Sequence, residues 1–270
     1  MRSRLAGIAT LLLLLATVVP LWFALVSSLT PEQRLFEAPS LVPHGLVLAH
    51  YRALASEHGF FGTVRNSLVV AAATTMLCLA LGAPCAYALA RLRFAGRRLV
   101  LGLILVVNMF PQIAIVSPLY LVLRRLHLIN SYPGLVLPYV TFAMPLAVWL
   151  LVGFFRQIPA ELERAAIVDG ASRMRVFVEI FLPLALPALA TTAILTFVYC
   201  WNEFLFALSF TTGPSRQTVP VGLALMRGQY RVPWGEIFAA SLVATAPVML
   251  LVLAFQRRIV RGLTSGALKG

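Results

Sequence analysis

Charged residues are scarce in this sequence. Only 11% of its 270 residues are charged, whereas 60% are hydrophobic. Soluble domains carry roughly 25% charged residues, so a soluble core cannot hide this much apolar surface. The composition therefore predicts a membrane protein without a separate soluble domain. Lysine occurs once, at Lys269, and acidic residues nine times, so the net charge of +13 comes from arginine.

The arginines stand in short clusters between apolar runs. Cytoplasmic flanks of membrane helices collect arginine and lysine in this way, whereas a nucleic-acid-binding protein gathers them along one polar face. We therefore expect membrane lipid, and no nucleic acid, as the partner of these charges.

Motifs for nucleotide binding and catalysis are also missing. The sequence contains no G-x-x-x-x-G-K-[ST] loop for phosphates, no His-Glu-x-x-His metal motif and no nucleophile elbow. Its three cysteines, Cys78, Cys85 and Cys200, lie inside apolar stretches without paired spacing and are expected to be small core residues. We therefore expect no catalytic residue, no metal site and no cofactor in this chain, which argues against an enzyme.

Six apolar runs approach the roughly 20 residues that cross a bilayer core. The first is too long for the apolar region of a signal peptide and is expected to be retained as a transmembrane helix. Six spans place both termini on one side, and that side carries the larger share of the arginines, which predicts cytoplasmic termini. The sequence thus predicts an all-α integral membrane protein, a single domain over residues 1–270, with helices at about 5–26, 67–90, 99–123, 135–155, 184–210 and 237–255.

Polar residues within these runs are candidates for the lining of a pathway, because polar groups in a bilayer usually face a cavity or another helix. Glu203 is the only acidic residue within an apolar run. It pairs with another helix, lines the pathway, or is protonated without a role, and the sequence does not decide among these. The candidates are Asn108, Gln112, Tyr199, Asn202 and Glu203.

The predicted cytoplasmic loop over residues 159–183 has the pattern of two short helices around a turn. Pro159 suits a first helical turn and Gly170 suits a stop. Ser172 can cap a second helix, on which Val176 begins an apolar stripe. The spacing leaves two interpretations open: a hairpin that lies on the lipid headgroups, or a small knob that docks into a partner protein.

The loop sequence ELERAAIVDGASRMRVFVEIFLPLALP resembles the signature loop of binding-protein-dependent ABC importer permeases. That signature reads Glu-Ala-Ala, three residues, Gly, nine residues and Ile-x-Leu-Pro. All of its positions match except the first, where Arg164 replaces the glutamate and Glu163 stands just before it. This departure puts in doubt an ionic role of the first position and leaves the steric role of the small residues untouched. The residues that the resemblance assigns to a coupling contact with an ATPase subunit are Glu163, Arg164, Ala165, Ala166, Asp169, Gly170, Ala171, Ile180, Leu182 and Pro183.

The resemblance covers nearly the whole chain, through segments such as NSLVV from Asn66, YALARLRFAG from Tyr87 and WNEFLFAL from Trp201. It points to the carbohydrate branch of the family, where the chain looks like the second permease subunit of maltose and trehalose importers. It implies half of a translocation pathway for a di- or oligosaccharide such as trehalose or maltose. The implied partners are a homologous permease, two ATP-binding subunits that hold ATP and magnesium, and an extracytoplasmic sugar-binding protein, in the cytoplasmic (inner) membrane of a bacterium or archaeon.

The C-terminal tail, residues 256–270, also resembles this subgroup, in which the tail is expected to reach between the ATPase subunits. Its glycine content alone favours a frayed basic end instead. The tail residues expected to make this contact are Gly262, Ser265, Gly266 and Lys269.

The outer loop over residues 211–236 is long and rich in glycine and proline, and we expect it to contact the sugar-binding protein. Two other classes fit less well. A secondary transporter driven by ions needs several ionisable groups within the membrane. A purely structural scaffold leaves the signature loop unexplained.

Overall fold

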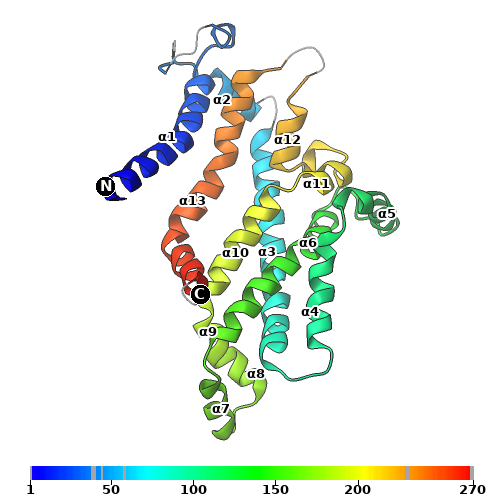
Figure 1. The fold of residues 1–270 in the computed structure, drawn as a ribbon. Coiled ribbons are helices and arrows are strands. Elements are labelled where there is room, and N and C mark those ends of the chain that lie inside the picture. Colours follow the sequence, from blue (N-terminus) through cyan, green and yellow to red (C-terminus); the bar gives the residue numbers. More distant parts are fainter. Residues whose placement is uncertain (1, 38–40, 44, 57–58, 229–231, 268–270) are drawn as a thin grey trace. The chain divides into compact units, whose positions relative to one another are not determined.

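This computed structural model describes residues 2–37, 41–43, 45–56, 59–228 and 232–267, which form helices joined by turns and contain no strand (Figure 1). The all-α prediction is confirmed. The described residues fall into two compact units. The first unit combines parts of 1–65 and 219–249, and the second combines parts of 66–218 and 250–270.

The first unit joins its two sequence segments through a helix cap. The Glu32 carboxylate accepts hydrogen bonds from the backbone N–H groups of Trp234 and Gly235, both at 3.1 Å. These groups open a helix and have no partner within it, and a negative charge suits this end of the helix dipole. The His50 ring lies 3.0 Å from the Thr30 carbonyl oxygen and so close to Gly235 that a side chain there would collide with the ring. The elements of this unit are α1 (Arg2–Ser28), the 3-10 helix η1 (Glu32–Arg34), α2 (Ala49–Ser56), the start of α3 (Phe60–Arg91), α12 (Val219–Leu225) and α13 (Trp234–Ala267) as far as Met249.

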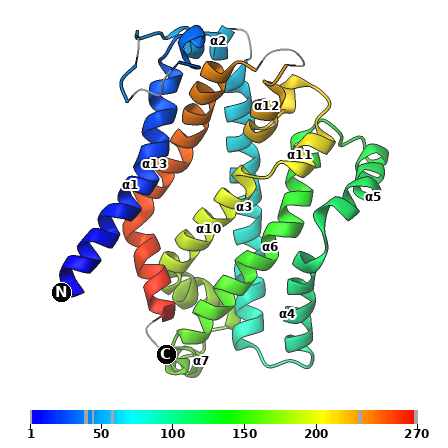
Figure 2. The same ribbon diagram turned by 45° about the horizontal axis from the view of Figure 1, so that its top comes forward.

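In the second unit, α6 (Tyr132–Gln157) packs between α4 (Arg97–Val106) and α10 (Leu186–Trp201) (Figures 1 and 2). An aromatic cluster joins the end of α3 to α6 and to the segment before α10. Its rings belong to Tyr87, Phe155, Phe177 and Phe181, with centroids 5.0 to 6.4 Å apart. The other elements are η2 (Val107–Met109), α5 (Gln112–Arg125), α7 (Ala160–Val168), α8 (Arg173–Val176), the π-helical turn η3 (Phe177–Phe181), α9 (Leu182–Leu184), α11 (Leu205–Phe210) and η4 (Pro214–Arg216).

Four helices among the described residues are long and apolar enough to cross a membrane. Two bent pairs of helices also pass this test, so the number of spans is up to six if each pair crosses as one span. The four single spans are Ala6–Ser28, Phe60–Arg91, Tyr132–Gln157 and Trp234–Gln256.

The third predicted span, 99–123, is one of these bent pairs. Its two parts, Arg97–Met109 and Gln112–Arg125, meet at 96°. Phe110 is extended, with φ −78° and ψ 130°, and Pro111 follows it. Proline lacks a backbone N–H and disfavours a helical conformation in the residue before it, which explains the break.

The fifth and sixth predicted spans also differ from the structure. The run 184–210 is not one helix, because α10 ends at Trp201 and α11 begins at Leu205. The segment that precedes α10 meets it at a bend of 75°. The last helix, predicted to end near residue 255, continues to Ala267, so the described part of the tail is helical despite its glycines.

Candidate functional site

The loop over residues 159–183 has the predicted helix-turn-helix form. Helix α7 follows Pro159 and ends at Val168, and Gly170 adopts a left-handed conformation with φ +84°. The N–H of Gly170 donates to the carbonyl of Ile167 at 3.0 Å, and the N–H of Ala171 donates to that of Ala166 at 2.9 Å. This pair of bonds is the Schellman arrangement that closes a helix around a glycine. The turn is therefore a specific stop and not a flexible link.

The second half of the loop is anchored to its own chain. The Ser172 hydroxyl accepts a hydrogen bond from the N–H of Arg175 at 3.3 Å and so caps α8, as the sequence predicts. Val176, Phe177 and Phe181 are buried in the core beside Tyr87. The predicted apolar stripe thus holds the loop onto the body of the second unit.

The predicted coupling residues divide into an inward and an outward set. Four of them, Ala166, Ala171, Ile180 and Leu182, are half-buried against the core of the second unit. Arg164, Ala165, Asp169, Gly170 and Pro183 are exposed.

Apolar side chains of α7 are exposed as well. Val168 is 85% exposed, and Leu162 and Ile167 are each more than two-fifths exposed. Met174 at the start of α8 is also exposed. The loop therefore exposes four apolar side chains, called the apolar knob here: Leu162, Ile167, Val168 and Met174.

Arg91, at the end of α3, fastens the base of this loop. Its Nε donates to Glu163 Oε2 at 3.0 Å, and its two terminal nitrogens donate to the carbonyls of Ile158 at 3.0 Å and Pro159 at 3.4 Å. The guanidinium also lies 4.9 Å from the centre of the Phe181 ring. The Arg91 and Glu163 side chains are only 9% and 13% exposed, so the pair is largely shielded from water.

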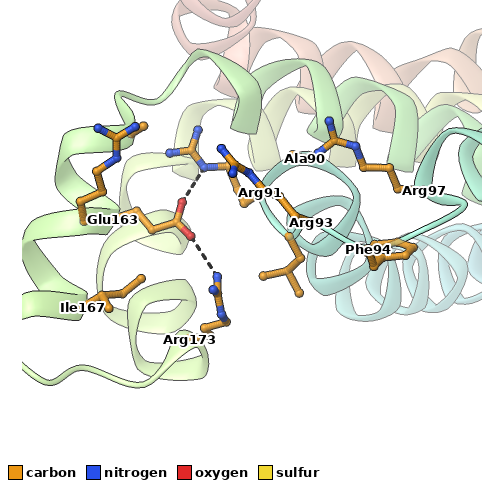
Figure 3. A pocket seen from close by; sticks show the side chains of 11 residues that line it. Ala90, Arg91, Arg93, Phe94, Arg97, Glu163, Ile167 and Arg173 are labelled. Atoms are coloured by element: carbon orange, nitrogen blue, oxygen red, sulfur yellow. Dashed lines mark hydrogen bonds and ion pairs between the residues drawn. The ribbon is translucent and has the colours of Figure 1, made fainter.

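The second carboxylate oxygen of Glu163 lies 3.5 Å from a terminal nitrogen of Arg173. Figure 3 shows Glu163 joined in this way to Arg91 and Arg173. Both oxygens are therefore occupied within the chain. Glu163 does not stand free to replace the glutamate that Arg164 displaces from the signature.

Four of the five pathway candidates come together between the start of α5 and the break after α10. Gln112, Tyr199, Asn202 and Glu203 line one cavity of about 430 Å³, and the fifth candidate, Asn108, is exposed on η2 and does not line it. The Gln112 amide donates to the Tyr199 hydroxyl at 2.8 Å, which ties α5 to α10.

Glu203 caps the helix that follows the break. Its carboxylate accepts hydrogen bonds from the N–H groups of Phe206 at 2.8 Å and Ala207 at 3.1 Å, at the start of α11. The residue is only 8% exposed. Of the three alternatives left open by the sequence, these contacts support a structural partner, which is the backbone of the following helix, while Glu203 also lines the cavity.

Two residues that fasten the candidate regions escaped the sequence analysis. Arg91 is one, because its partner Glu163 lies far along the chain. The other is Asn66, which is buried at the start of the second unit and donates to the carbonyls of Ser215 at 3.0 Å and Gln217 at 2.9 Å. The Tyr132 hydroxyl donates to its amide oxygen at 2.8 Å. The only sequence signal for either residue was its place in a segment that resembles the family.

The other residues singled out by the sequence lie at the end of α13 and inside the helices. Gly262, Ser265 and Gly266 lie in the last turns of α13, and Lys269 lies outside the described residues. Cys78, Cys85 and Cys200 are free, and within the described ranges no group of three His, Cys, Asp or Glu side chains gathers in a way that would hold a metal ion.

Comparisons with known proteins agree with the resemblance. The family described as "Binding-protein-dependent transport system inner membrane component" matches residues 78–265. The chain is 43% identical over 255 residues to the trehalose transport system permease protein SugB of Mycobacterium tuberculosis, a match that covers 94% of this chain and 93% of the relative. It is 39% identical over 266 residues to the trehalose/maltose transport system permease protein MalG of Thermococcus litoralis, with 97% and 95% covered.

A further relative and a solved structure extend the comparison. The sulfoquinovosyl glycerol transport system permease protein SmoH of Agrobacterium fabrum is 40% identical over 264 residues, with 97% of this chain and 93% of the relative covered. A chain in the crystal structure of a bacterial ABC transporter involved in the import of the acidic polysaccharide alginate shares the fold, with a TM-score of 0.80 at 22% identity. That match covers 95% of this chain and 98% of the other.

Replacing Arg91 with alanine is expected to loosen the base of the loop. It leaves the shielded Glu163 carboxylate with only an exposed partner and leaves two carbonyls without a donor, at a cost of about 2–4 kcal/mol. Hydrogen exchange should then accelerate by roughly 30-fold or more across α7, because local opening becomes that much more frequent. Arg175→Ala serves as control, since it breaks only the exposed Arg175–Glu179 pair, which contributes about 0–1 kcal/mol. Equal effects of the two variants would contradict the role given to Arg91.

Replacing Glu203 with alanine is expected to lower the melting temperature of the purified protein. Two buried N–H groups at the start of α11 lose their acceptor, at a cost of about 1–2 kcal/mol. Glu203→Gln keeps one acceptor oxygen, so its melting temperature should fall by less than half as much. Asn202→Ala is the matched control, because the Asn202 amide donates only to the carbonyl of Val198 in its own helix. The capping role fails if the glutamine variant is destabilised as much as the alanine variant.

Proposed function

This chain belongs to the inner-membrane components of binding-protein-dependent transport systems, and we propose that it forms half of the translocation pathway of an ATP-driven sugar importer. It is a multi-pass permease and a transport subunit, not an enzyme. The proposed assembly adds a homologous permease, two ATPase subunits that bind ATP and magnesium, and an extracytoplasmic sugar-binding protein. The excess of arginine on one side of the spans supports cytoplasmic termini.

The proposed cargo is a di- or oligosaccharide such as trehalose or maltose. Two relatives that cover nearly the whole chain are named for trehalose and for trehalose/maltose, which supports this class. Another, at similar identity, is named for sulfoquinovosyl glycerol. Gln112, Tyr199 and Asn202 bring neutral polar groups to the lining beside the Glu203 carboxylate, and neutral polar groups suit hydroxyl-rich cargo.

The observation that carries the proposal is the exposed apolar knob on a rigid base. Exposed apolar side chains gain about 1.5–3 kcal/mol each when fully buried, and large apolar patches on a surface mark sites of protein contact. The Schellman turn and the Arg91 contacts fix the shape of α7, so the helix can transmit a push from an ATPase subunit to the body of the second unit. Arg164 is exposed and Glu163 is turned inward, so the proposed contact depends on shape and apolar burial.

The outer loop is the proposed contact for the sugar-binding protein. Its first part is fastened by two hydrogen bonds from Asn66 in the second unit, and Tyr132 holds Asn66 in place by a third. Leu225 at the end of α12 is exposed, as is Arg227 beyond it. The C-terminal segment is proposed to reach between the ATPase subunits, a role supported by the resemblance of its sequence and by its continuation of α13.

Gly170→Asp is expected to abolish ATP-dependent uptake of labelled trehalose and maltose by reconstituted transporter, while membrane insertion stays intact. A Cβ at this position meets nothing within 4 Å in the chain itself, so any clash arises with a docked partner. Gly59→Asp is the matched control: Gly59 has φ +58° and equally open space, but it lies in the loop before α3. Both substitutions strain the backbone by a similar amount, about 1 kcal/mol. Normal uptake by Gly170→Asp would overturn the coupling proposal.

Changing Leu225 and Arg227 together to serine is expected to reduce stimulation of ATPase activity by the sugar-loaded binding protein by roughly tenfold, since loss of a few contact residues typically costs more than 1 kcal/mol. Basal ATPase activity should be unchanged. Arg65→Ser together with Phe61→Ser, two exposed positions on α3, gives a control for lost surface side chains. Full stimulation of the Leu225 and Arg227 variant would show that this part of the loop does not contact the binding protein.

A further inference from the structure

A cleft of about 730 Å³ lies between α7 and the turn that joins α3 to α4. Its lining contains five arginines and one glutamate, Glu163 (Figure 3). Arg91 and Arg173 pair with that glutamate. The arginines of the cleft are Arg91, Arg93, Arg97, Arg164 and Arg173.

Three of these arginines have no negative partner among the residues that the structure describes. Arg93, Arg97 and Arg164 form no ion pair with any residue in the described part of the chain. Like charges gathered around one space repel each other, and a negative ligand within that space relieves the repulsion. The cleft therefore has the charge of a site for an anion.

The surroundings of the cleft place it where a membrane meets water. Arg91 ends α3, a membrane span, and Arg97 begins α4. Just beyond Arg97, the side chains of Leu99 and Leu103 on α4 are 67% and 59% exposed. Phe94, in the turn itself, is also exposed. Exposed apolar side chains that suit acyl chains thus follow the cations within the next turns of the same helix.

We propose that the cleft binds the phosphate headgroup of an anionic phospholipid, with the acyl chains along α4. Guanidinium groups bind phosphate oxygens through paired hydrogen bonds, and basic pockets at the cytoplasmic ends of membrane helices are typical sites for anionic headgroups. A soluble phosphate or an acidic protein segment would match the arginines and leave Leu99 and Leu103 uncovered. The bound headgroup would join the α3–α4 turn to α7 and so link the position of the loop to the lipid composition. This site does not depend on the identity of the sugar or on the coupling proposal.

The test measures binding of phosphatidylglycerol and phosphatidylcholine to the assembled, purified transporter by native mass spectrometry. The variant Arg93→Gln with Arg97→Gln removes two cleft charges that have no place in the proposed ATPase contact. The control, Arg98→Gln with Arg156→Gln, removes two exposed arginines that do not line the cleft. Wild type and control should prefer phosphatidylglycerol, and the cleft variant should bind it roughly 10- to 30-fold more weakly.

Three results would overturn the proposal. If the cleft variant and the control bind phosphatidylglycerol equally weakly, the lipid responds to the general surface charge and not to this cleft. Competition by millimolar inorganic phosphate would show a site for a soluble anion. Lipid binding that appears only after the ATPase subunits are removed would show that a protein surface occupies the cleft. The single variant Arg93→Gln, at an exposed position, repeats the comparison if the double variant is unstable in detergent.

Discussion

A helix end leaves backbone groups that need partners, and at three helix ends of this chain a charged side chain supplies them. Glu32 and Glu203 accept hydrogen bonds from the N–H groups that open α13 and α11. Arg91 donates to the carbonyls of Ile158 and Pro159, just after α6. Acids stand at helix starts and a base at a helix end, the arrangement that the helix dipole favours. In a chain with so little charge, this placement makes the broken helices possible within an apolar surrounding.

The fold class and the approximate spans could be predicted because hydropathy and length decide them. The form of the signature loop could also be predicted, because Gly170 and Ser172 act through local backbone geometry. Hydropathy does not distinguish a straight helix from a bent one, so the prolines inside the runs suggested kinked helices, but the full break at Phe110 and Pro111 could not be predicted. The continuation of α13 was missed for a different reason: glycine lowers helix stability by about 1 kcal/mol at most, and other interactions can outweigh that amount.

The contacts that fix the candidate site could not be predicted, since they join distant parts of the chain. Arg91 and Glu163 are 72 positions apart, and Asn66 and Ser215 are 149 apart. A sequence without aligned relatives shows such residues only as isolated polar positions. The sequence singled out Glu203 but did not give its role. A carboxylate that caps a helix and a carboxylate that binds cargo both occur as a lone acidic residue within an apolar run. The structure commits both of its oxygens to α11 and leaves Gln112, Tyr199 and Asn202 as the neutral groups of the cavity.

Arg164 and Glu163 together show how the loop accommodates a changed signature. A carboxylate moved by one position on a helix turns by about 100°, and here that turn brings it onto Arg91 and Arg173 instead of into solvent. The ionic group therefore strengthens the base of α7, while its outer face keeps apolar side chains and an arginine. A contact that transmits motion needs a stiff helix on this chain and a surface of complementary shape on the partner. Moving the charge inward increases stiffness without altering the shape that Ala165 and Gly170 present, so the change preserves the parts of the signature on which such a contact depends.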